Sequence, residues 1–162
     1  EVSLLDYNDI IDSIGGAESI VVGVLIGFEG DIDGVILFLL KKEFVHLILN
    51  SLIGTELKNF EEVSEIEMSA LSEISNIMVS SYVNSISSLT NMNINVTVPS
   101  LNIDMSGALL DSVTAEFSEI ADKAVFIKEK YYCMNETVYS YMLLLPSMPS
   151  LKILLNKFGI YT

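Results

Sequence analysis

Polar and apolar side chains separate along residues 59–91 with the period of an α-helix. Each helical residue advances by about 100°, so positions three and four apart share a face. One face collects polar side chains, namely Glu62, Glu65, Ser69, Glu73, Asn76, Ser80 and Asn84. A broad opposite arc collects apolar ones, namely Ala70, Leu71, Ile74, Ile77, Met78, Tyr82, Ile86 and Leu89. The pattern predicts one long helix with a packed back and a polar front.

The polar front of this helix carries an acid without a partner. Asn59, followed by Glu62 three residues later, resembles a capping box and predicts the start of the helix. No Lys or Arg lies between Lys58 and Lys123, so Glu73 has no ion-pair partner three or four positions away. Asn76 follows one turn later, although asparagine is mildly unfavourable within a helix. Glu73 and Asn76 are either ordinary solvated positions or contacts to another molecule, in which case Glu73 is free to pair with a cation of that molecule.

The remaining pattern predicts strands and short helices on both sides of the long helix. Before it we expect a strand at 2–5, a short helical or irregular piece at 6–14, a hairpin of 19–28 and 34–40, and a helix at 41–53 stopped by Gly54. After it we expect a strand at 93–98 ended by Pro99, a helix at 106–120, a hairpin of 123–133 and 137–145, and a helix at 149–158 closed by Gly159.

This order repeats itself, and a gapless offset of 105 places residues 36–40 on 141–145 and Gly54 on Gly159. We therefore predict a single α+β domain over 1–162, with pseudo-repeats 1–54 and 106–159 flanking the motif helix 59–91. In this pseudo-two-fold duplication, two hairpin–helix repeats build an antiparallel sheet on which the long helix packs. Subtracting 105 from 69 gives −36, so the equivalent helix of the first copy would precede residue 1.

The missing counterpart has two explanations that the sequence does not separate: about forty N-terminal residues were lost, or they were left out of this chain. In either case apolar surface that this helix would cover is expected to be exposed. A homodimer or an exchanged arrangement would fill the gap, and a monomeric mass by light scattering would count against it.

Composition narrows the classes of function. Of the 162 residues, 51% are hydrophobic, but no apolar run approaches the roughly eighteen residues needed to cross a bilayer. The N-terminus carries acids where a signal peptide carries basic residues, so a cytoplasmic protein is expected. The net charge of −14 disfavours nucleic acid and membrane binding and favours a partner with a basic face.

Self-contained catalytic sites of the common kinds are not visible in the sequence. Cys133 is the one cysteine, so it cannot form an internal disulfide and is expected to be a small core or strand residue in a reducing compartment. His46 has no second histidine or cysteine nearby, so a metal site is not expected. The sequence also lacks a G-x-S-x-G elbow, a Gly-rich phosphate loop with Lys, and an H-E-x-x-H motif. Any reaction would borrow groups from its partner.

The spacing Ser69-x3-Glu73-x2-Asn76-x22-Pro99 resembles the signature of the CheC-type chemotaxis phosphatases, a family that also includes CheX and the flagellar-switch protein FliY. Residues 69–78, the turn 30–34 and residues 141–146 are also similar to CheC, so the resemblance runs over essentially the whole chain. Families of this kind commonly carry two motif helices side by side, which agrees with the expected missing counterpart.

The resemblance implies hydrolysis of the aspartyl phosphate of the response regulator CheY in bacterial or archaeal chemotaxis. The regulator would bring Mg²⁺, the phosphoryl group and a lysine, so no cofactor of the chain's own is expected. Asn76 would orient the hydrolytic water and Glu73 would dock the regulator, with Ser69 and Pro99 in support. The alternative is a non-catalytic adaptor that binds the receptor deamidase CheD or a flagellar-switch component. A structural dimer without phosphate chemistry is a third reading.

Overall fold

The computed structural model describes residues 1–116, 123–133 and 135–159. In chain order its strands and helices are β1 (Val2–Asp6), α1 (Tyr7–Ile14), β2 (Ile20–Gly30), β3 (Gly34–Leu40), α2 (Lys42–Ile53), α3 (Glu65–Thr90), β4 (Ile94–Val96), β5 (Ser100–Met105), α4 (Ser106–Glu116), β6 (Lys123–Cys133), β7 (Glu136–Pro146) and α5 (Met148–Lys157). A 3₁₀ turn, Phe60–Glu62, precedes α3. Of the predicted helix at 106–120, residues 117–120 lie outside the described ranges.

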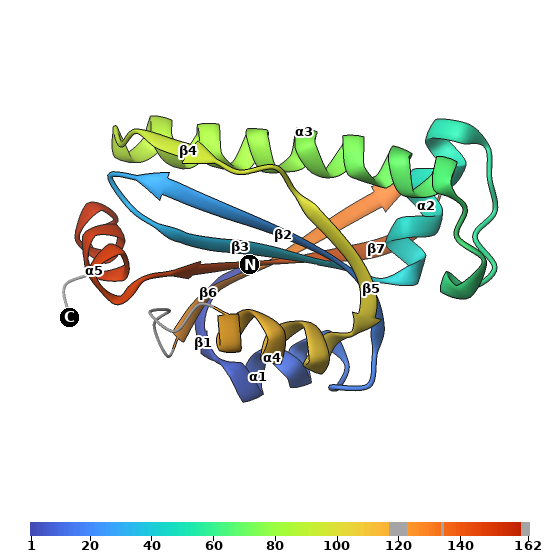
Figure 1. Cartoon of the computed structure of the whole chain (residues 1–162), viewed down its shortest axis with the longest axis horizontal. Helices are drawn as coiled ribbons and strands as arrows, with labels where there is room; N and C mark the ends of the chain where they lie inside the picture. Colours follow the sequence, from blue (N-terminus) through green and yellow to red (C-terminus); the bar gives the residue numbers. More distant parts are fainter. Residues whose placement is uncertain (117–122, 134, 160–162) are drawn as a thin grey trace.

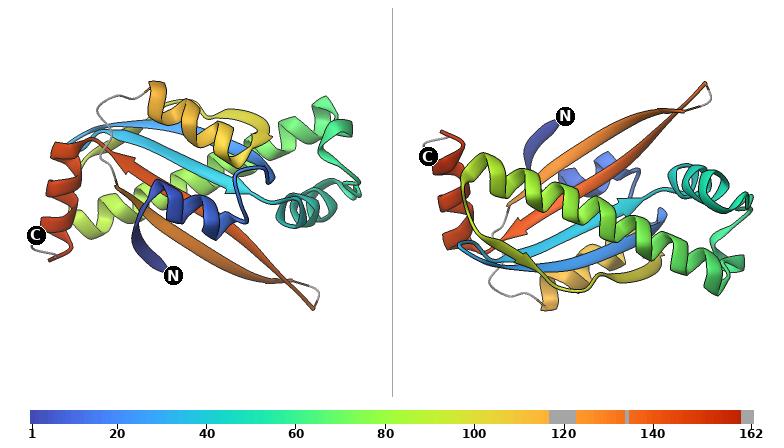
Figure 2. Two further views of the ribbon diagram at one scale, coloured as in Figure 1. Left: turned by 90° about the horizontal axis from the view of Figure 1, so that it is seen from below. Right: turned by 90° about the horizontal axis from the view of Figure 1, so that it is seen from above.

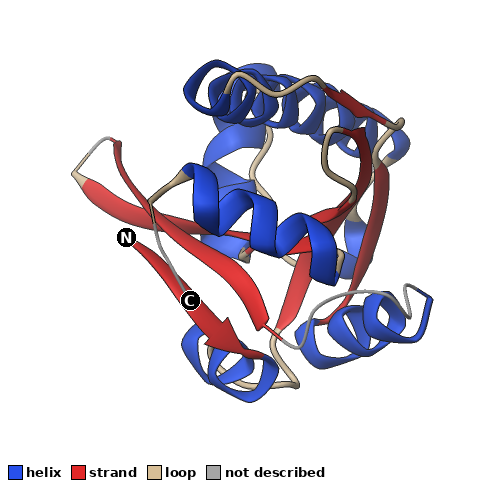
Figure 3. Cartoon of the chain, turned by 90° about the vertical axis from the view of Figure 1, so that its left-hand side faces the viewer, coloured by secondary structure: helices blue, strands red, loops and turns tan. Residues whose placement is uncertain are grey.

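The sheet separates two layers of helices (Figure 1). On one face, α2 and α3 bury Phe44, Leu49, Leu71 and Val79 against the even-numbered positions of β2 and β3. On the other face, α1 and α4 cover the odd-numbered positions of the same strands. Seen from above, α3 crosses the sheet diagonally, and the β6–β7 hairpin extends beyond it (Figure 2). Seen from one end, helices lie on both sides of the sheet (Figure 3).

The sheet is antiparallel, with the strand order β1-β6-β7-β3-β2 and with β4 and β5 both on the outer edge of β2. The order strand, helix, hairpin, helix occurs twice, as β1-α1-β2-β3-α2 and as β5-α4-β6-β7-α5. The first strand of each copy pairs with a strand of the other copy: β1 pairs with β6, and β5 pairs with β2. The predicted α+β fold with a pseudo-two-fold duplication is confirmed.

The single gapless offset of 105 is wrong. It places residues 4–6 of β1 on residues 109–111 of α4, and it places Phe38, which faces α3, on Leu143, which faces α1 and α4. The strand pairings and the two faces of the sheet instead show which positions of the two copies are equivalent. These are Phe38 and Met142, Val22 and Val125, and Val2 and Leu101. The offset varies because loops of different length separate the strands, and a one-residue shift turns a strand side chain to the opposite face.

The long helix begins later than predicted. Asn59 Oδ1 accepts a hydrogen bond from the Glu62 N–H at 3.0 Å, but this cap belongs to the 3₁₀ turn Phe60–Glu62. The chain is extended again at Val63, and α3 starts with a second capping box at Ser64 and Glu67. Both caps fit the same short motif, so its first occurrence gave the wrong helix start.

The strand β5 was missed in the sequence. Residues 93–98 were expected to form a strand that Pro99 ends, but β4 spans only Ile94–Val96 and the chain resumes pairing with β2 at Ser100. Between these two strands, Thr97 still exchanges hydrogen bonds with Gly27: its N–H donates to the Gly27 carbonyl and its Oγ1 accepts from the Gly27 N–H, both at 2.9 Å. Pro99 interrupts one edge of the sheet because it offers no N–H to the ladder.

Candidate functional site

The helix α3 contacts the sheet along a narrow stripe of residues four positions apart. Leu71, Ser75, Val79 and Val83 are buried, and the Ser75 hydroxyl is satisfied by the Leu71 carbonyl at 2.6 Å. Ile77 and Leu89 were expected on the packed back, but 60% and 77% of their surfaces are exposed. Ile77 lies only about 40° around the helix from Glu73, so the contact line with the sheet leaves it on the solvent side.

Glu73 and Asn76 lie on the outward side of α3, one turn apart. Glu73 is exposed and Asn76 is half-buried on the flank of the same ridge. Within the described residues, neither side chain makes a hydrogen bond or an ion pair. Both polar groups are therefore available to another molecule, and their catalytic roles remain predictions.

Ser69 and Pro99, which are 30 residues apart in the sequence, line one hollow beside the first turns of α3. We call it the α3–β5 hollow; its volume is about 520 Å³, and it is lined by Val63, Glu65, Met68, Ser69, Ser72, Pro99 and Leu101. After α3 the chain runs back along the helix through β4 toward β5 (Figure 1). Pro99, between these two strands, therefore lines the hollow beside the first turns of α3. Among the described residues, Ser69 makes no hydrogen bond to Glu73.

The turn at residues 30–34 fixes the far end of α3. The Asp31 N–H donates to the Asn93 carbonyl at 3.0 Å, and the Asp31 carboxylate accepts from the Asn93 N–H at 2.7 Å. The Asp33 carboxylate accepts hydrogen bonds from the hydroxyls of Ser147 and Ser150, at 3.0 and 2.7 Å. This turn therefore ties the chain just after α3 to the N-terminus of α5, which holds the motif helix in place on the sheet.

His46 has a structural contact that its sequence position did not reveal. Its Nδ1 accepts a hydrogen bond from the Leu57 N–H at 3.1 Å, which anchors the connection between α2 and α3. Cys133 lies at the end of β6, opposite Glu136, as a strand residue. Among the described residues, no group of three His, Cys, Asp or Glu side chains is placed to hold a metal ion.

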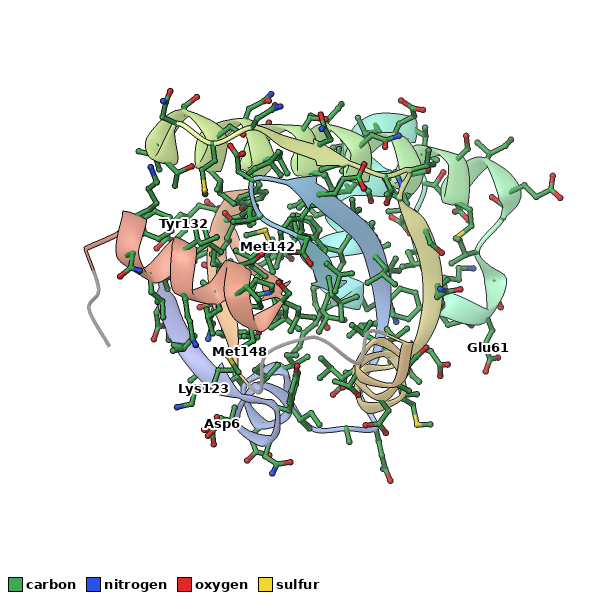
Figure 4. All side chains as sticks on the ribbon, turned by 60° about the vertical axis from the view of Figure 1, so that its left-hand side comes forward. Asp6, Glu61, Lys123, Tyr132, Met142 and Met148 are labelled. Atoms are coloured by element: carbon green, nitrogen blue, oxygen red, sulfur yellow. The ribbon has the colours of Figure 1, made fainter. Side chains whose placement is uncertain are left out.

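An apolar groove separates α3 from α2 on the side of the ridge opposite Ser72. Its volume is about 310 Å³, and it is lined by Phe44, Leu47, Ile48, Ser51, Leu52, Ile74, Met78 and Tyr131. At the edge of the sheet on the same face, Val2 and Leu4 of β1 expose 68% and 41% of their surfaces. Beside them, the carboxylate of Asp6 meets the ammonium of Lys123 at 3.9 Å (Figure 4). No described helix is both long and apolar enough to cross a membrane.

Comparisons with known proteins give a consistent result. Residues 66–103, which include all four motif positions, match the model of the CheC-like family. The CheY-P phosphatase CheC of Bacillus subtilis (strain 168) is 27% identical over 160 residues, which cover 96% of this chain and 77% of that protein.

Two solved structures share the fold. A structure of Thermotoga maritima FliY matches with a TM-score of 0.71 and 21% identity, over 98% of this chain and 78% of the solved chain. A chain of the FliM–SpeE complex from H. pylori matches with a TM-score of 0.66 and 14% identity, over 98% of this chain and 76% of that chain. At these identities the structures establish the fold alone. Together with the family model and the curated relative, they confirm the resemblance of this chain to the CheC-like family in sequence and in fold.

Proposed function

We propose that this chain hydrolyses the aspartyl phosphate of a CheY-type response regulator. The observation that carries the proposal is the placement of Glu73 and Asn76 one turn apart on the outward ridge of α3, with no partner among the described residues. The 27% identity to a CheY-P phosphatase over most of the chain supports it. The net charge of −14 favours a partner with a basic contact surface.

The proposed reaction requires no covalent bond between this chain and the phosphoryl group. A water oxygen forms a bond to phosphorus, and one O–H bond of this water breaks as its proton passes to a phosphate oxygen or to solvent. The bond from phosphorus to the regulator's aspartate oxygen breaks, and the carboxylate leaves. The regulator carries the phosphoryl group and the Mg²⁺ that neutralises its charge. Asn76 both accepts a hydrogen bond from the water and donates one to it, which holds the water in line with the breaking bond. Glu73 pairs with a cation of the regulator and so fixes the position of the regulator on α3.

The decisive experiment follows the decay of the phosphorylated regulator with this chain present in excess. We expect faster decay with the unmodified chain and a loss of about 10²-fold or more of the acceleration in Asn76→Ala, with binding largely intact, because the water loses its alignment. Asn84→Ala, which removes an exposed amide two turns further along α3, is the matched control and should remain active. Glu73→Lys should weaken binding through charge reversal at a contact, whereas Glu61→Lys, in the 3₁₀ turn before α3, should not.

The second candidate is a non-catalytic adaptor, and the shared fold with FliY and with a chain of the FliM–SpeE complex favours keeping it. As an adaptor the chain would bind a phosphorylated regulator, CheD or a flagellar-switch component without turnover. Equal decay of the phosphoryl group with and without the chain, at concentrations that saturate binding, would replace the phosphatase proposal with this one.

A further inference from the structure

The lining of the α3–β5 hollow is partly apolar and partly polar, and we call its polar side chains the rim. Val63, Met68, Pro99 and Leu101 supply apolar atoms, while Glu65, Ser69 and Ser72 supply oxygens. A long side chain with a methylene stem and a polar tip matches this division, since its stem can lie on apolar surface while its tip reaches polar groups. Lysine and arginine have this shape.

The polar groups of the rim are unused within the described residues. The side chains of Glu65, Ser69 and Ser72 make no hydrogen bond or ion pair there, in contrast to the buried Ser75, whose hydroxyl donates to its own helix. Glu67 already serves the helix start, because its carboxylate accepts from the Ser64 N–H at 2.7 Å and from the Ser64 hydroxyl at 3.0 Å. The Glu65 carboxylate therefore remains free to pair with a cation from outside.

The segment that forms the hollow contains no basic side chain that could occupy it. Residues 59–122 contain no Lys or Arg, and the whole chain carries a net charge of −14. An acidic side chain of a partner would be repelled here, and a purely apolar one would leave Glu65 unpaired. Charge complementarity thus selects a cationic occupant.

The hollow is continuous with the ridge that bears the proposed site. Ser69 precedes Glu73 by four positions and Ser72 precedes Asn76 by four, so each pair shares one side of α3 at a separation of about 6 Å along the axis. A molecule that contacts Asn76 and Glu73 and extends one turn toward the start of α3 therefore reaches Ser69 and Ser72, which line the hollow.

We infer that the α3–β5 hollow is a docking pocket for one lysine or arginine side chain of the response regulator, with Glu65 as its counter-ion and Ser69 and Ser72 as hydrogen-bond acceptors. This inference rests on the proposed function for the identity of the partner. It also gives Ser69 and Pro99 a shared role as two walls of one recognition pocket, separate from the positioning of water by Asn76.

The test measures the dissociation constant of a CheY-type regulator held in its phosphorylated form with beryllofluoride, by isothermal titration calorimetry. Ser72→Trp fills the hollow and should weaken binding about tenfold or more, while Ser88→Trp, an exposed serine near the other end of α3, should bind normally. Glu65→Gln should weaken binding about threefold and reduce its dependence on salt. Glu61→Gln makes the same change of charge on a side chain that points away from the chain (Figure 4), and should leave binding unchanged.

Each outcome decides between the two proposals. If Ser72→Trp and Glu65→Gln bind as tightly as the unmodified chain, with normal circular dichroism and unfolding midpoints, the pocket is overturned while the phosphatase proposal stands on the decay experiment. If both variants weaken binding but the unmodified chain does not accelerate decay, the pocket is supported and the phosphatase proposal fails. If Glu61→Gln weakens binding as much as Glu65→Gln, the loss of affinity comes from the change in net charge, and the proposed pocket is overturned.

Discussion

On β6, Tyr131 lies beside the carboxylate of Glu129 on the sheet face that packs against the core beneath α3. The Tyr131 hydroxyl donates to Glu129 Oε2 at 2.6 Å, and the fully buried Ser140 hydroxyl donates to the same oxygen at 3.2 Å. Burial, together with the hydrogen bond to Glu129, raises the pKa of Tyr131 to about 12. The neutral phenol is therefore favoured in the folded chain, because it must donate to a carboxylate in partly dry surroundings.

This raised pKa of Tyr131 predicts a loss of stability at alkaline pH. The unfolded chain releases the phenol proton near pH 10 and the folded chain near 12, so the contribution is complete below pH 10 and is lost as pH rises toward 12. Urea unfolding at pH 9 and pH 11.5 measures it. Tyr131→Phe should show a smaller loss between the two pH values than the unmodified chain. Tyr132→Phe, at a largely exposed neighbour, should behave like the unmodified chain.

At the scale of an element, the residues before α3 show that the same capping motif can start either a 3₁₀ turn or a long α-helix. Asn59 caps a single 3₁₀ turn, whereas Ser64 caps the whole helix Glu65–Thr90 through the reciprocal bonds with Glu67. The same apolar and polar period continues across both turns, so periodicity alone did not place the break at Val63. The break matters for the site, because Val63 is one wall of the α3–β5 hollow.

The two caps should therefore differ in their effect on stability. Ser64→Ala removes the side-chain acceptor for the Glu67 N–H and should lower the free energy of unfolding by about 1 kcal/mol. Asn59→Ala removes the cap of a short exposed turn and should cost clearly less. Denaturant midpoints of the two variants check this, and a larger loss in Asn59→Ala would contradict the assigned helix start.

At the scale of the whole molecule, the pseudo-two-fold relation exposes a difference between the two edges of the sheet. Leu101 and Ile103 of β5 pack against the core beneath α3, whereas the equivalent Val2 and Leu4 of β1 are exposed. In β2, Val22 and Val24 are fully buried, whereas their equivalents Val125 and Ile127 in β6 are only partly buried. The apolar pattern is thus present in both copies, but α3 covers only one of them.

This asymmetry predicts unequal costs for the same substitution at the two edges. Leu101→Ala should lower the free energy of unfolding by about 2 kcal/mol, because it leaves a gap under α3, whereas Leu4→Ala should cost less than about 1 kcal/mol. Urea unfolding of both variants measures the difference. Equal losses would mean that the face of β1 is covered in solution, and light scattering would then show whether a second copy covers it.

Local patterns of the sequence predicted most of the elements and the candidate residues, but neither β5 nor the start of α3. The 3.6-residue period predicted α3, alternation and turn residues predicted both hairpins, and Gly54 ends α2 in the left-handed conformation as expected. The motif spacing predicted Ser69, Glu73, Asn76 and Pro99 as a group, and the absence of basic residues predicted that Glu73 is unpaired. Apart from Pro99, these features depend on residues a few positions apart, so local patterns in the sequence are enough to predict them.

Only the tertiary structure decided which strands pair and what the motif encloses. The exchange of β1 and β5 between the copies, and the variable offset that relates them, depend on hydrogen bonds between residues far apart in the chain, which local periodicity does not specify. The hollow between Ser69 and Pro99 exists because β4 returns along α3 and Pro99 interrupts the sheet edge there. Sequence determined which polar groups stand on the ridge, and the packing of α3 on the sheet determined which of them share a surface.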